Sequence, residues 1–278
     1  MKHFVRNTAA LGAVLTIVGF GMAMGAQAMG GRWDNSWYWK EPVRLGMGWD
    51  EDWGSMPADA YQGEAAGADT VSFSDVEDVK ISLGAGEIIW KTGEGDSILV
   101  KVDGRAELPN RCQVYEEDKE LVIRLKGRNN RGIKAEITVP EGSRFSDVEI
   151  DVGAGTIQAA QLLCGSLDVE LAAGSAEFFQ CEAEESTFSC AAGEIRYQGK
   201  LAGGTEANCA AGSIALILDQ KKEDFNYEID AAGGMIEIGG VEYSGIAARD
   251  TVSSGAPYSL DLSTAAGNIQ VEFLGGDV

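Results

Sequence analysis

Apolar and polar residues alternate through the middle of the chain, and a glycine interrupts the alternation at a regular interval. The inward positions before each glycine are −7, −5 and −3, and after it the apolar parity shifts to +2 and +4. Alternation with a period of two predicts strands that bury one face. The parity shift predicts a bend at which small residues let stacked backbones approach while the apolar side stays inward. The regular glycines, each 19 residues after the last, are Gly155, Gly174, Gly193 and Gly212.

The same template recurs on both sides of this block. A fixed repeat of about 20 residues is the mark of a solenoid, in which each coil buries its apolar face against its neighbours. The sequence therefore predicts an all-β, single-chain, β-helix-like solenoid with coils of about 19 residues that stack about 4.8 Å apart. The additional copies are Val79–Trp90, Tyr227–Ile238 and Leu260–Val271. The predicted structural corners are Gly86, Gly155, Gly174, Gly193, Gly212, Gly234 and Gly267.

Two stretches depart from the repeat. Lys91–Asp147 is predicted to interrupt the solenoid with strands of its own before the regular coils begin. After Asp219 the repeat loosens, Gly239–Pro257 is predicted as a long loop, and Tyr258–Leu274 as the final coil. The strands expected within the interruption are Ser97–Val102, Arg111–Tyr115, Glu120–Leu125 and Ile133–Val139.

The N-terminal region has the features of an export signal. Met1–Asn7 is basic, and Thr8–Ala28 is apolar and uncharged. Ala26-Gln27-Ala28 has the form of a signal-peptidase site, whereas the length of the apolar run approaches the ~20 residues of a membrane-spanning helix. We therefore expect an N-terminal apolar helix at residues 1–28 that serves as a signal peptide or membrane anchor. A Trp-rich juxtamembrane segment and linker are expected at 29–70, and the solenoid domain at 71–278. The rest of the chain is expected to lie outside the cytoplasm.

Five of the six tryptophans lie just after the apolar run, in a stretch without regular periodicity. Tryptophan beside a membrane segment is typical of the headgroup level. Alternatively, these rings cover an open end of the solenoid, since an uncapped stack exposes its core and a strand edge. The five are Trp33, Trp37, Trp39, Trp49 and Trp53.

Composition excludes several classes of function. The formal net charge is −22, so the surface repels nucleic acid and anionic headgroups. His3, the one histidine, lies in the N-terminal targeting region, which leaves the exported part without the base of a Ser-His-Asp or Cys-His mechanism or a histidine ligand for zinc. We therefore expect neither nucleic-acid binding nor a histidine-dependent enzyme.

The five cysteines include no C-x-x-C pair, so a zinc cluster is poorly supported. Cys190 and Cys209 are 19 residues apart and share the inward position −3. One interpretation is two small buried residues stacked in adjacent coils. The other is a disulfide between those coils.

Outward positions before the corners carry rows of carboxylates. Asp151 and Glu170 could act as an acid/base pair on a sugar, or such carboxylates could hold Ca²⁺. The third interpretation, a plain solvated face, is favoured because the rows decay to Thr, Ser and Asn within two coils. The sequence thus assigns no catalytic, cofactor-binding or metal-ligating residue. The rows are Glu149, Asp168, Thr187 and Glu206 at −6, and Asp151, Glu170, Ser189 and Asn208 at −4.

One basic loop, Lys126–Gly132 with Lys134, stands out in this acidic chain. It could meet an anionic glycopolymer or phospholipid headgroup, although a solvated hairpin tip is the commoner role of such a run.

The repeated unit, apolar residues alternating up to Ala-Gly and followed by Ile two residues later, resembles the toastrack-type family of adhesin-like bacterial surface domains. Val79–Trp90 and the stretch ending Ile137–Gly142 share the likeness, which covers about Val71 to Val278. The resemblance implies a β-solenoid, often placed after a transmembrane segment, and no catalytic residues. It also implies that some members take part in sensing envelope or lipid stress.

Three functional hypotheses follow. The leading one is a non-enzymatic extracytoplasmic domain that presents a rigid β surface to an envelope or host-surface ligand. The second is a stress-sensing domain that acts with a membrane partner and needs residues 8–28 for membrane association. The third is a polysaccharide-active enzyme that uses Asp151 and Glu170.

Overall fold

The computed structural model describes residues 60–67, 69–103, 112–126, 132–244 and 248–275. The expected N-terminal helix, residues 29–59 of the Trp-rich segment and linker, and most of the basic loop lie outside these residues. The described part is all-β apart from one short 3-10 turn, η2 (Lys222–Asp224). The strands are β1 (Glu64–Ala65), β2 (Thr70–Phe73), β3 (Asp78–Gly93), β4 (Ile98–Val102), β5 (Cys112–Glu117), β6 (Glu120–Leu125), β7 (Ile133–Pro140), β8 (Arg144–Ala160), β9 (Leu163–Cys190), β10 (Glu194–Leu201), β11 (Gly204–Cys209), β12 (Ser213–Leu218), β13 (Phe225–Ala231), β14 (Met235–Ile238), β15 (Val241–Ser244), β16 (Ala248–Val252), β17 (Tyr258–Thr264) and β18 (Asn268–Phe273).

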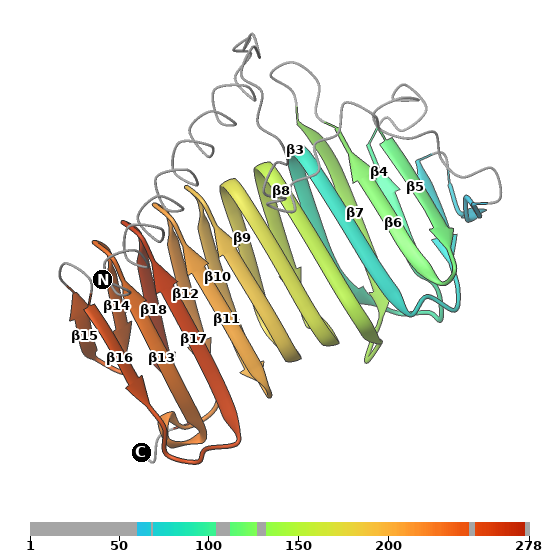
Figure 1. The fold of residues 1–278 in the computed structure, drawn as a ribbon. Coiled ribbons are helices and arrows are strands. Elements are labelled where there is room, and N and C mark those ends of the chain that lie inside the picture. The colour runs from blue at the N-terminus through green and yellow to red at the C-terminus, as the bar shows by residue number, and fades with distance from the viewer. Residues whose placement is uncertain (1–59, 68, 104–111, 127–131, 245–247, 276–278) are drawn as a thin grey trace, which may run out of the picture.

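The strands stack side by side as a long row of coils (Figure 1). Each coil contributes one stretch before its glycine corner and one after it, so the coils build two faces. The pre-corner face follows the order β5–β6–β3–β8–β9–β9–β11–β17–β13–β16, because β9 passes through this face twice. The post-corner face follows the order β4–β7–β3–β8–β9–β10–β12–β18–β14–β15. Neighbours within the coils pair in parallel, as the repeat predicts.

The predicted interruption at Lys91–Asp147 is wrong in part, because it contains another coil of the stack. β6 pairs in parallel with β3 before the corner, with Val79 opposite Leu121, and β7 pairs in parallel with β3 after it, with Ile88 opposite Ala135. The expected strands are present, but they extend the solenoid. The Ala-Ala-Gly signature is missing here because the basic loop replaces the tight corner between β6 and β7.

Chain order and stack order differ at both ends. β6 and β7 lie outside β3, although they follow it in sequence. At the other end β17 and β18 insert between the coil of β11 and β12 and the coil of β13 and β14. Tyr258–Leu274 is therefore the last coil in the chain but not in the stack. The segment Gly239–Pro257, predicted as a loop, holds β15 and β16.

Antiparallel strands close both ends of the row. β5 and β4 pair antiparallel with β6 and β7 at one end, and β16 and β15 with β13 and β14 at the other. β2 pairs with β4, β1 pairs with β2, and Tyr61 forms a bridge with Glu116 of β5. Such added strands cover edges that would otherwise pair with another chain.

The seven predicted corner glycines lie in one file. A Cβ added to each would come within 3.0 Å of backbone or side-chain atoms of the neighbouring coil, closer than real Cβ atoms approach. Only Gly86 and Gly174 among them have a positive φ, so close backbone approach is the shared requirement. The file runs in the order Gly86, Gly155, Gly174, Gly193, Gly212, Gly267 and Gly234.

The change of parity falls two residues before the glycine in several coils. Ala172, Ala210 and Ala265, at position −2, are buried, whereas Ala192 and Ala211, at −1, are exposed. The backbone ladder stays intact through these bends, since the Ala210 and Ala211 N–H groups donate to Cys190 and Ala191 carbonyls at 2.8 Å. The corner therefore turns the chain without leaving its backbone unpaired.

Inward side chains form one continuous core along the row. Tyr197 lies against Phe178 and Phe188, with ring centroids 6.2 and 5.4 Å apart. Burial follows the predicted alternation before and after each corner, so the repeat fixes which residues face in.

Candidate binding face

The outward residues of the pre-corner face form rows at the spacing of the strands. Parallel register places Glu149 beside Asp168, and Asp151 beside Glu170. In-register neighbours in a sheet are about 4.8 Å apart. The structure therefore brings together the four carboxylates that the sequence singled out. The −6 row runs Lys80, Glu149, Asp168, Thr187, Glu206, Asp261 and Glu228.

Lys80, which sequence reasoning missed, is the cation at one end of this row. Its Nζ lies 2.5 Å from Glu149 Oε2, and both side chains are about two-thirds buried, with 29% and 34% exposed. Hydrogen bonding and charge from Glu149 outweigh burial and raise the Lys80 pKa. The signal was in the sequence, because Lys80 occupies position −6 before Gly86.

The carboxylates beyond Lys80 repel one another and are partly desolvated. Burial, helped by the charges of Glu149 and Glu170, raises the pKa of Asp151 to about 7. Burial and neighbouring carboxylates also raise the pKa of Asp168 and of Glu170. Asp168 Oδ1 is buried and makes no hydrogen bond to any residue that the structure describes. The cluster therefore favours holding a proton or meeting a cationic group.

The far part of the face is less crowded with charge. Thr187 and Ser189 separate the cluster from Glu206, and Asn208 donates a hydrogen bond to Glu206 Oε1 at 2.6 Å. The next carboxylate in the row is Asp261. Burial raises the pKa of Asp261, and the negative charge of Glu228 raises it further. Among residues 60–275 that the structure describes, no group of three or more His, Cys, Asp or Glu side chains is arranged to hold a metal ion.

The post-corner face carries paired charges and one exposed aromatic residue. Lys91 Nζ lies 2.7 Å from Glu136 Oε1, and Lys134 Nζ lies 3.2 Å from Glu87 Oε2. Phe179 is 51% exposed on this face. Since opposite charges are paired here, this face is electrostatically more balanced than the pre-corner face.

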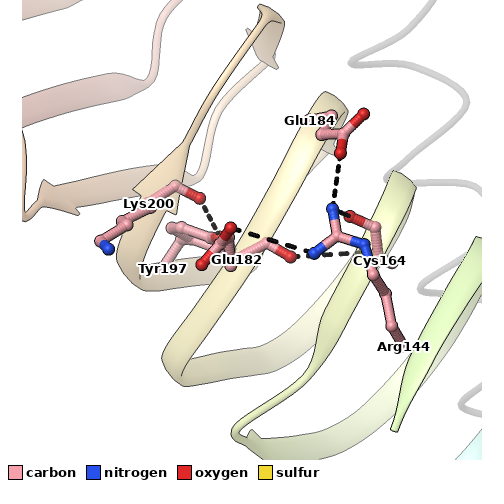
Figure 2. A network of polar contacts seen from close by, with 6 residues as sticks. All are labelled: Arg144, Cys164, Glu182, Glu184, Tyr197 and Lys200. Carbon is pink, nitrogen blue, oxygen red and sulfur yellow. Dashed lines mark hydrogen bonds and ion pairs between the residues drawn. The ribbon is translucent and has the colours of Figure 1, made fainter. Parts of the chain in front are cut away.

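A polar network links three successive coils where the chain passes from the post-corner face of one coil to the pre-corner face of the next (Figure 2). The Arg144 guanidinium donates to Glu184 Oε1 at 2.6 Å and to the Cys164 carbonyl at 3.5 Å, and lies 3.9 Å from Glu182 Oε1. Nearby, the Tyr197 hydroxyl donates to the Lys200 carbonyl at 2.8 Å. This network holds the coils in register.

Other predicted features are placed as follows. Cys190 and Cys209 are register partners inside the stack and are both free thiols. The tryptophans Trp33 to Trp53 and loop residues 127–131 lie outside the described residues. The structure does describe Lys134, which is paired with Glu87. No helix in the described part of the chain is long and apolar enough to cross a membrane.

Comparison with known proteins now defines the class of protein. The chain matches the Toastrack DUF4097 family over residues 71–272, most of its length. It belongs to that family, and the repeat, the corner glycines and the all-β stack agree with this. No curated protein matches the sequence significantly.

Solved structures that the chain resembles come from Clostridium, Bacteroides and Parabacteroides species. A "putative cell adhesion protein" from Clostridium sporogenes is 14% identical with a TM-score of 0.39, over 73% of this chain and 98% of that one. A "putative adhesin" from Bacteroides fragilis is 14% identical with a TM-score of 0.40, over 73% and 95%. A "putative lipid binding protein" from Parabacteroides distasonis is 15% identical with a TM-score of 0.29, over 74% and 94%. No activity follows from similarities at this level.

Proposed function

We propose that this chain is a non-enzymatic binding module of the cell envelope and that the pre-corner face is its binding surface. Residues 8–28 would export it, either as a cleaved signal or as an anchor, so the solenoid would lie outside the cytoplasm. The ligand would be an envelope or host-surface component, as the leading hypothesis from the sequence has it.

One observation supports this proposal most strongly: outward carboxylates occupy the −6 row from β8 to β13 at the spacing of the strands, with one break at Thr187. The strands of this stretch are paired on both sides, so their side chains are held on a stiff support. Lys80 neutralises Glu149 at one end only. No described cation forms an ion pair with Asp168, Glu206 or Asp261, whereas Lys80 is paired with Glu149. The face therefore suits a ligand that carries ammonium or other cationic groups.

Binding assays with matched charge variants test the proposal. The full chain is incubated with isolated cell wall, lipid vesicles and host glycans, and saturable binding to at least one is expected. The variant D168N/E206Q/D261N should lose that binding, whereas E177Q/E237Q/E272Q on the post-corner face should keep it. Binding should weaken as salt rises. Uniformly negative results, or equal loss in both variants, would count against this function.

The pKa of Asp151 near 7 keeps the enzyme hypothesis open to a direct test, because such a carboxyl can donate a proton at neutral pH. A binding module should leave every glycan in the panel uncleaved. If cleavage is detected and D151A/E170A abolishes it, the module is an enzyme instead.

The regulatory hypothesis differs in what it requires of residues 8–28. Membrane fractionation with mass spectrometry of the mature N-terminus separates the two roles. A retained segment that is needed for signalling supports a stress sensor with a membrane partner. Release of the mature protein into the medium excludes that role and leaves the binding module.

A further inference from the structure

Two cysteines meet inside the stack at the glycine corner. Cys190 ends β9 and Cys209 ends β11, and the two are in-register partners of parallel neighbouring strands. Both side chains point inward and are 3% exposed. Leu171 and Thr264 are the corresponding residues of the coils on either side, so the two thiols have only each other as sulfur neighbours in this column.

The corner leaves space for sulfur because the adjacent residues are glycines. A Cβ on Gly212 would lie 2.7 Å from Cys190 Sγ, and a Cβ on Gly267 would also clash with Cys209 Sγ. In-register Cα atoms of parallel strands are about 4.8 Å apart, within the range of about 4.4–6.8 Å that disulfides span.

We propose that Cys190 and Cys209 form a disulfide that joins two adjacent coils when the chain folds in an oxidising compartment. The oxidant is a disulfide, either a small molecule such as oxidised glutathione or a thiol–disulfide oxidoreductase. One cysteine thiolate attacks the oxidant, forms a mixed disulfide and expels one thiol. The second cysteine attacks the mixed disulfide and expels the other thiol. The pair loses two electrons and two protons, and the oxidant is reduced to two thiols.

Burial sets the timing of this exchange. Since both side chains are almost fully buried in the folded corner, the exchange takes place while the coils are still assembling. Once the corner closes, the bond is shielded from reductants.

The other cysteines supply internal controls. Cys164 is the register partner of Phe145, and Cys181 that of Gly199, so the partner of each in these strand pairs is not a cysteine. Cys112 lies at the far end of the row, opposite Leu125. Cys190 and Cys209 are thus the two cysteines that the described strand pairings place in register with each other.

Peptide mapping of the full chain tests the pairing. The chain is refolded either in a glutathione redox buffer or in excess reductant, then denatured and alkylated. Cleavage after Glu, Lys and Arg separates Cys164, Cys181 and Cys190, and leaves Ser186–Glu194 and Ala207–Lys221 as separate peptides. We expect these two to be joined in the oxidised sample, with three of the five thiols alkylated. Five alkylated thiols, or a cross-link through Cys112, Cys164 or Cys181, would overturn the proposal.

Thermal melting provides a second readout. A cross-link that closes a 19-residue loop should raise the melting temperature of the oxidised chain by about 10 °C over the reduced one. The C164A/C181A variant should keep this difference, and C190A/C209A should lose it. Should C190A/C209A fail to fold, the mapping of C164A/C181A still decides the matter. Identical melting of oxidised and reduced wild type would contradict the proposal.

Discussion

Replacing Gly174 with alanine tests the close approach of coils at the corner. A Cβ at this position would lie 2.8 Å from Gly155 N and closer still to Gly155 O, and neither backbone atom can move without shifting a coil. Gly174 also has a φ of 116°, which a side chain disfavours. Gly95 is the matched control, since its φ is 121° and nothing lies within 4 Å of its Cβ.

The two substitutions separate steric overlap from backbone strain. Strain at positive φ costs about 1–3 kcal/mol and should be common to both variants. Overpacking at Gly174 adds about 1–3 kcal/mol. A change of 1 kcal/mol moves the melting temperature of a domain this size by about 2–4 °C, so Gly174→Ala should melt about 10 °C below wild type and well below Gly95→Ala.

Circular dichroism melts of the full-length wild type and both variants measure the difference. If the melting temperature of Gly174→Ala falls no further than that of Gly95→Ala, the corner does not need a glycine for the close approach of the coils. The reasoning about the glycine file would then be refuted, although the strands themselves could remain.

Three further perturbations examine the face and the stack. The pKa of Asp151 is raised to about 7 in the folded state, so the folded protein binds the proton of this carboxyl more tightly than the unfolded chain does. The stabilisation from the protonated carboxyl is therefore fully present below about pH 4 and is lost as the pH rises through about 7. Because Asp151 is only partly buried, we discount the effect to about 2 kcal/mol. Asp151→Asn should raise the urea midpoint at pH 8 and flatten its fall between pH 5 and 8; a lower midpoint at pH 8 would contradict this. Lys80→Gln should lower the free energy of unfolding at pH 8 by about 1 kcal/mol, because it removes the ion pair with Glu149. Lys101→Gln is the control and should leave the free energy of unfolding unchanged, because its ion pair is exposed and 3.9 Å long. Equal losses in the two variants would show that Lys80 does not offset the acidic row. Leu262→Ala, at a fully buried site in the inserted coil, should cost about 2–5 kcal/mol by urea denaturation, and a cost under about 1 kcal/mol would place that coil outside the core.

The regular part of the fold could be predicted because one physical pattern repeats there. Val148, Ile150 and Val152 alternate with polar residues, and Gly155 marks the bend, so parity and spacing together define a coil. The same pattern identified the outward rows that contain Asp151 and Glu170. Nothing more than alternation and a glycine was needed for these elements.

The ends of the stack could not be predicted from periodicity. The coil of β6 and β7 was missed because residues 126–132 replace the Ala-Ala-Gly corner, although Leu121 and Ile137 keep the inward alternation. The insertion of Leu262 and Ile269 between earlier coils was missed because pattern specifies which face is buried and not which neighbour it meets.

Only part of the candidate binding face could be predicted from the sequence. Charge and parity placed the carboxylates outward, but the register with Lys80 and the burial of Asp168 arise from neighbours 69 and 19 residues away. Desolvation depends on those contacts, so the raised pKa of Asp151 had no sequence signal of its own.

The account depends most on the order in which the coils stack, and spin-label distances measure that order directly. In the post-corner face, Gln158, Glu177, Arg196, Ala215, Gln270 and Glu237 form one outward row. In a chain whose native cysteines are replaced by alanine, labels at Gln158 and Gln270 should be about 19 Å apart, and labels at Gln158 and Glu237 about 24 Å apart, from four and five strand spacings. A reversed order of the two distances, or distances unrelated to the strand spacing, would contradict the stack and the binding face built on it.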